Sequence, residues 1–180
     1  MLNVILQLEA PIVDVTIENP YNLQDFYDDK LSILAIKAID QRARIHNVEM
    51  QLTAEIGLVQ RIVFYGCELY SGQMKLAENY ADLHSVHSIC LLDGRLWRDS
   101  PKVHHAFRLT DLESARVLSG TLEIQTLELG WYNMREADLA TASTLESWLY
   151  WLLHAHEYEI EELLKLFPRA GIQQALQTIR

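Results

Sequence analysis

The sequence predicts a single α/β domain spanning residues 1–180. Two stretches indicate strands: IVDVTIE (12–18) alternates between apolar and polar residues, and VHSICLLD (86–93) is a continuous apolar run typical of a buried strand. Between them, apolar residues recur with the spacing of one helix face, at Leu58, Ile62, Tyr65 and Leu69. Alternating strands and helices indicate an α/β fold, and the length suits one domain.

The remaining elements follow from the same patterns, taken in chain order. The expected elements are a helix over 2–8, a strand over 12–18 with Val13, Val15 and Ile17 facing inward, a hairpin of strands over 31–39 and 44–52, a helix over 56–76, and strands over 86–93, 102–109 and 121–129. Ser143 and Glu146 have the spacing of a capping box before a helix, and Pro168 precedes a last short helix over 170–179. We expect a core over 1–95, added strands over 100–130 and a helical C-terminal part over 138–180.

Composition argues against several classes of function. The net charge of −10 opposes a broad, non-specific grip on nucleic acid, which depends on Lys and Arg neutralising phosphates. No apolar run approaches the roughly 18 residues needed to cross a bilayer, so no membrane partner is expected.

Cys67 and Cys90 lie in apolar segments without metal-ligand spacing, which favours reduced thiols in a cytoplasmic protein. The seven histidines lack the spacing of a zinc site.

The hairpin carries the residues of greatest chemical interest. In its second strand, Ile45, Asn47, Glu49 and Gln51 point to one face, and the residues between them point to the other. A carboxylate and an amide side by side fit either a hydrated sheet surface or half of a metal site. The other half of such a site would lie on the preceding strand.

Six short segments also occur in a family-specific order. They are NPYN, SILAIKA, HNVEMQ, LYSGQMK, HHAFRL and a strand ending in LEL, and together they cover most of the chain. On these segments the chain resembles the Rpn-like group of recombination-promoting nucleases and transposases in the PD-(D/E)XK nuclease superfamily. The resemblance implies an α/β core of a helix, a three-stranded meander, a helix and a strand. It also implies a metal-dependent DNA endonuclease ancestry, with DNA as the partner.

The resemblance further implies which residues form the site. The family pattern places an Asp on the second strand and Glu-x-Gln on the third, so Glu49 would bind Mg²⁺, the backbone carbonyl of Met50 would be a further ligand, and Gln51 would be catalytic. Gln73, at the end of the long helix, matches a family Gln and is a third candidate catalytic residue. The alternative for Gln73 is a hydrogen bond at the end of the helix. Mg²⁺ suits such a site because it prefers carboxylate and carbonyl oxygens together with water and phosphate.

Two departures from the family pattern imply an inactive protein. Ala35 occupies the position of the metal-binding Asp, and a methyl group cannot bind a cation. The chain also begins after the family's first helix, which carries a motif like DFAFKKLF, so we expect a truncated, degenerate member. The alternatives are an active endonuclease that uses a substitute carboxylate, and a non-enzymatic interaction protein. Asp14, Asp28 and Asp29 are the candidate substitutes, because Asp40 has the opposite parity to position 35.

Two basic residues near the candidate site have plainer interpretations. Lys37 shares the parity of Ala35 and is expected to pair with Glu49 across the hairpin or to contact phosphate. Arg61 is expected on the hydrated side of the helix.

Overall fold

The computed structural model of the chain describes residues 1–18, 34–74 and 79–178. These residues form two compact units, one of Val13–Trp131, called the sheet unit here, and one of Met1–Ile12 with Tyr132–Arg180, called the terminal unit. The expected single domain and its subdivision therefore stay predictions.

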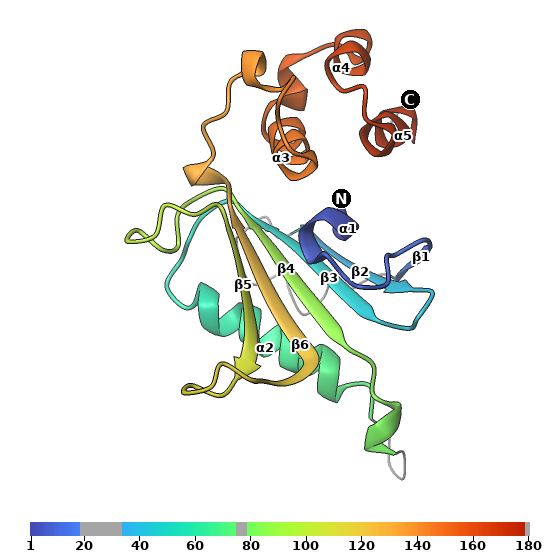
Figure 1. Cartoon of the computed structure of the whole chain (residues 1–180), viewed down its shortest axis with the longest axis vertical. Coiled ribbons are helices and arrows are strands. Elements are labelled where there is room, and N and C mark those ends of the chain that lie inside the picture. The colour runs from blue at the N-terminus through green and yellow to red at the C-terminus, as the bar shows by residue number, and fades with distance from the viewer. Residues whose placement is uncertain (19–33, 75–78, 179–180) are drawn as a thin grey trace. The chain divides into compact units, whose positions relative to one another are not determined.

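The sheet unit is built on six strands in the order β1-β2-β3-β4-β6-β5 (Figure 1). The strands are β1 (Val15–Glu18), β2 (Leu34–Asp40), β3 (Ile45–Gln51), β4 (Val86–Leu92), β5 (His104–Thr110) and β6 (Val117–Glu128). β1, β2 and β3 form an antiparallel meander, β3, β4 and β6 run parallel, and β5 is antiparallel to β6. This mixed sheet with its crossing helix confirms the predicted α/β fold.

Helix α2 (Leu58–Ser71) packs on one face of the sheet, over β4 and β6. Its buried stripe contains Leu58, Ile62, Gly66 and Leu69, close to the predicted stripe. Gly66 allows this close packing, because a Cβ atom there would lie 3.1 Å from a methyl carbon of Leu122 on β6 and would require that side chain to shift. The helix thus approaches the middle of the sheet closely. It places the side chains of its first two turns over the ends of the parallel strands.

The inward face predicted for residues 12–18 is wrong. Val13, Val15 and Ile17 are 79%, 37% and 71% exposed. The strand is shorter than expected, and within the described residues it forms the edge of the sheet and pairs with β2 alone. Helix α2 packs over β4 and β6, and in the described part of the chain it does not cover this edge. The apolar side chains of the alternating pattern are therefore exposed here.

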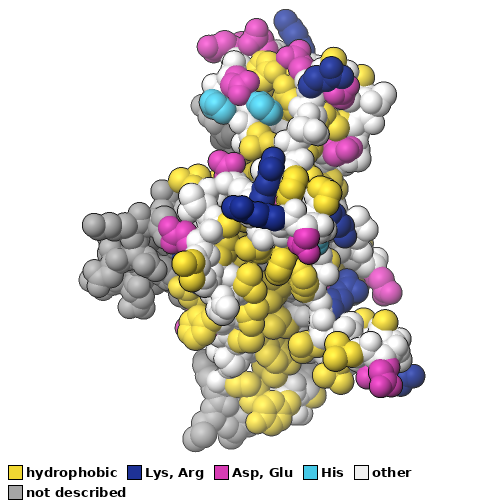
Figure 2. All heavy atoms as spheres, turned by 90° about the vertical axis from the view of Figure 1, so that its left-hand side faces the viewer, with side chains coloured by type: hydrophobic (Ala, Val, Ile, Leu, Met, Phe, Trp, Pro, Cys, Tyr) yellow, Lys and Arg dark blue, Asp and Glu magenta, His cyan; other side chains and the backbone are white. Residues whose placement is uncertain are grey.

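The opposite edge of the sheet is also partly apolar at its surface. Figure 2 looks onto the left-hand side of Figure 1 and shows a band of hydrophobic side chains. On β5 and α2, Phe107, Leu109 and Val63 are 41%, 52% and 42% exposed. Helix α2 therefore leaves part of the surface of β5 exposed.

A 3-10 turn over Tyr80–Asp82 lies before β4, and another over Leu129–Trp131 ends the sheet unit. The terminal unit contains α1 (Leu2–Leu6), α3 (Thr144–His154), α4 (Ile160–Leu166), α5 (Ala170–Thr178) and 3-10 turns over Glu136–Asp138 and Ala155–Glu157. The predicted capping box is present, because Ser143 Oγ accepts from Glu146 N and Glu146 Oε2 accepts from Ser143 N. Among the described residues, no helix is long and apolar enough to cross a membrane.

Candidate functional site

The β2–β3 hairpin has the register that the sequence predicts. The two strands are antiparallel, and Ala35 lies directly opposite Glu49, with Leu34 opposite Met50. Directly opposed residues of an antiparallel pair share a face and lie within side-chain reach of each other. Position 35 is therefore the place from which a second carboxylate could meet the carboxylate of Glu49.

Glu49 is a buried carboxylate with one partner in the described structure. Glu49 is 3% exposed. Asn47 Nδ2 donates a hydrogen bond to Glu49 Oε1 at 2.7 Å. Its Oε2 is buried without a hydrogen-bond partner. Burial raises the pKa of Glu49, and the hydrogen bond from Asn47 and the positive charge of Arg61 only partly oppose this rise. The site thus holds an acidic group in a weakly solvated position.

Arg61, on the first turns of α2, completes the cluster. Its Nη2 donates to Oε1 of Gln51, which is 3% exposed. The expectation that Arg61 faces water is therefore wrong. A signal was present, because Arg61 follows Leu58 by three residues and so continues the same helix face. Asn47 was likewise missed, although it shares the parity of Glu49 and Gln51.

Several polar atoms under α2 lack hydrogen-bond partners in the described structure. They are Asn47 Oδ1, Glu49 Oε2, Gln51 Nε2, Arg61 Nε, Ser88 Oγ and Thr126 Oγ1. The sheet register brings them together, since Asn47 pairs with Ser88, and Glu49 and Thr126 both pair with Cys90. Native interiors contain few such atoms, and each one calls for an explanation such as a catalytic role or a bound water or ion. We therefore take this cluster as the candidate functional site of the sheet unit.

The donor set does not fit a magnesium ion by itself. In the described ranges, no three His, Cys, Asp or Glu side chains lie close enough together to hold a metal. Met50 sits in a central strand and is paired with Leu34 on one side and Leu91 on the other. Among the residues that the structure describes, Glu49 is the one carboxylate of this cluster, whereas Mg²⁺ demands near-octahedral oxygen ligands.

The candidate substitute acids are either committed elsewhere or not described. Asp40 bonds Arg44 Nε at 2.6 Å and His46 Nε2 at 3.0 Å. Burial acts to raise the pKa of Asp40, but hydrogen bonds from His46, Arg42 and Arg44 outweigh it and lower the pKa to about 2. Asp14 accepts from Val15 N on the exposed edge, beyond β2. Asp28 and Asp29 lie outside the described residues.

Lys37 and Gln73 are placed away from Glu49. Lys37 forms an ion pair with Glu18 at 2.8 Å, so the pairing expected with Glu49 is wrong. Gln73 follows the last residue of α2 and bonds the backbone of His84 twice, through Nε2 to the carbonyl and through Oε1 to the amide, both at 3.0 Å. The structure brings Glu49 and Gln51 together but joins Gln73 to the start of β4.

The family described as PD-(D/E)XK nuclease family transposase matches residues 1–180. The chain belongs to this family. No curated protein and no solved structure matches it. Members of the PD-(D/E)XK nuclease superfamily typically use a divalent metal ion and act on DNA, so the family supports a nuclease-like or transposase-like function for the chain at this general level.

Proposed function

We propose that this chain is a catalytically inactive member of its nuclease family. The single observation that carries the proposal is the register of the hairpin, which sets Ala35 against Glu49. Metal-dependent phosphodiester hydrolysis needs an ion that activates water and stabilises charge on the phosphate. One buried carboxylate without a second acidic ligand binds that ion weakly.

The contacts of the cluster support this proposal. Gln51 is engaged by Arg61, and Glu49 by Asn47, so protein groups rather than a second acid surround the carboxylate. In this proposal Glu49, Met50 and Gln51 are the remnant of the metal and catalytic residues. Gln73 acts as a helix-end clamp on His84. The protein then works as a non-cleaving partner of DNA in the cytoplasm.

A plasmid cleavage assay tests the proposal. Supercoiled DNA is incubated with the protein and Mg²⁺ or Mn²⁺, and Glu49→Gln serves as the matched control because it removes the charge at nearly constant size. We expect the parent and Glu49→Gln to nick no more DNA than the buffer. Nicking by the parent that Glu49→Gln abolishes would contradict the proposal and establish the active endonuclease with a substitute carboxylate.

If the parent cleaves, the substitute can be located with the same assay. Asp14→Asn removes the described candidate, and Asp28→Asn and Asp29→Asn remove the two outside the described residues. Loss of cleavage in one of these variants would identify the second metal ligand.

A further inference from the structure

A polar groove lies at the carboxyl ends of β3 and β4, beside the strand that carries Glu49 and Gln51. It has a volume of about 690 Å³, and its lining includes Asp93, Arg95, Arg98, Gly130 and Trp131. Asp93 N donates to Gln51 O at 2.8 Å, which ties the groove wall to the end of β3. Carboxyl ends of parallel strands are the usual place for ligands in α/β sheets.

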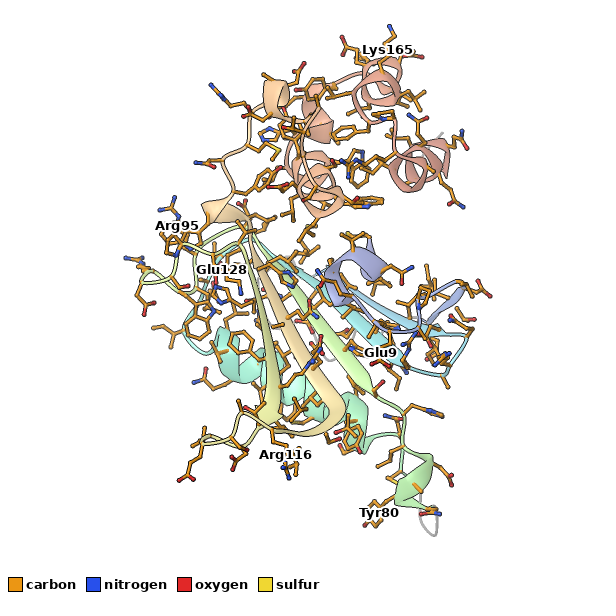
Figure 3. All side chains as sticks on the ribbon, viewed as in Figure 1. Glu9, Tyr80, Arg95, Arg116, Glu128 and Lys165 are labelled. Carbon is orange, nitrogen blue, oxygen red and sulfur yellow. The ribbon has the colours of Figure 1, made fainter. Side chains whose placement is uncertain are left out.

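Arg95 is held in place within this groove. Its Nε donates to Gly130 O at 2.7 Å, and its guanidinium lies 4.1 Å from the centroid of the Trp131 ring. Such a stack orients the guanidinium and leaves its terminal nitrogens available. Figure 3 shows Arg95 near Glu128, at one end of the sheet.

The segment between Arg95 and Arg98 is anchored by Glu128. This buried carboxylate accepts from Leu96 N at 2.6 Å and from Trp97 N at 3.1 Å. Arg98 follows directly and is exposed, and no hydrogen bond or ion pair of its side chain is found in the described part of the chain. Two guanidiniums, one stacked and one unpaired, therefore project from a fixed backbone, a geometry that suits bidentate contacts to phosphate.

We propose that this groove binds the phosphates of single-stranded DNA, with the guanidiniums of Arg95 and Arg98 contacting the phosphate oxygens. The inference rests on the proposed function and names the form of DNA that the chain retains. The groove has room for a few groups of a single strand. The carboxylate of Asp93 partly offsets the positive charge of the two guanidiniums, so the groove contacts a short stretch of phosphates. A net charge of −10 opposes the long phosphate contacts on which duplex binding depends.

Fluorescence anisotropy with a labelled oligothymidine and a duplex of equal length tests this inference. We expect the single strand to bind more tightly, with Arg98→Ala weakening it by at least about fivefold and lowering the slope of log K against log salt by about one. Arg95→Ala should weaken it similarly, and Asp93→Asn should strengthen it.

Arg116→Ala is the matched control, because Arg116 is exposed and lies at the other end of β6 (Figure 3). It should leave binding unchanged, and thermal unfolding checks that each variant is folded. Absence of binding, equal or tighter binding of the duplex, or equal losses for Arg98→Ala and Arg116→Ala would each overturn the inference. The cleavage assay tests inactivity separately. Absence of binding to both forms of DNA would also contradict the DNA partner in the proposed function, whereas tighter binding of the duplex, or equal losses in the two variants, would overturn this inference alone.

Discussion

At the scale of single residues, Arg61 is the cation of the candidate site. It reaches Gln51 from α2, and its charge partly offsets the burial of Glu49. Removing such a charge costs more stability than the net strength of its interaction would suggest. The reason is that its buried partner is left without a hydrogen bond.

Replacing Arg61 with Met should therefore destabilise the protein. Gln51 Oε1 would lose its donor, and Glu49 would lose the charge that moderates its pKa. We expect a loss of about 1–3 kcal/mol in the free energy of unfolding at pH 7. Urea unfolding measures this loss, and Gln60→Met, at an exposed neighbouring position of the same helix, is the control. Equal effects of the two substitutions would mean that Arg61 is an ordinary surface residue.

At the scale of elements, β3 and β4 bring two buried histidines together on the face opposite Glu49. His46 and His87 are register partners, and their rings stack with centroids 5.1 Å apart. Burial, followed by the charge of His46, lowers the pKa of His87 to about 4. The folded protein therefore holds His87 neutral at a pH where an unfolded chain would protonate it.

This arrangement should make stability depend on pH. Because the folded pKa lies below the unfolded value of 6.5, the unfolded state binds more protons between them. Stability is then full above about pH 6.5 and falls as the pH drops to about 4, by on the order of 3 kcal/mol. Urea unfolding of the parent and of His87→Gln between pH 7.5 and 4 measures the effect. Parallel curves for both proteins would contradict it.

The elements also show what the sequence could predict. The hairpin and α2 were foreseen because alternation and helical spacing report which residues share a face. The exposure of β1 is not predictable in this way, because alternation cannot tell an edge strand from a central one. The stripe of Leu58, Ile62, Tyr65 and Leu69 predicts that Arg61 lies on the other side of the helix, although its spacing of three residues from Leu58 is also compatible with a position against the sheet. For Gln73 the sequence predicts either a hydrogen bond at the helix end or a side chain in the site, and the bonds to His84 agree with the first. The identity of His84 as the partner carries no signal in the sequence, because the contact is to its backbone.

At the scale of the whole molecule, the family match covers the entire chain, whereas the structure divides it into two units. The terminal unit joins residues 1–12 to residues 132–180, and no linker composition marks this boundary. Such an association of distant segments is a tertiary property that local patterns do not report. The candidate site lies wholly in the sheet unit, so its chemistry can be tested without reference to the other unit.

The central claim is that the family's metal centre is incomplete at position 35. Isothermal titration calorimetry of Mg²⁺ and Mn²⁺ tests it most directly, with the parent, Ala35→Asp and the size-matched Ala35→Asn. The parent and Ala35→Asn should bind no more tightly than about millimolar, about −4 kcal/mol. Ala35→Asp should bind more tightly, since the register sets it opposite Glu49. Micromolar binding by the parent that Glu49→Ala abolishes, or equal affinities for all three proteins, would contradict the claim.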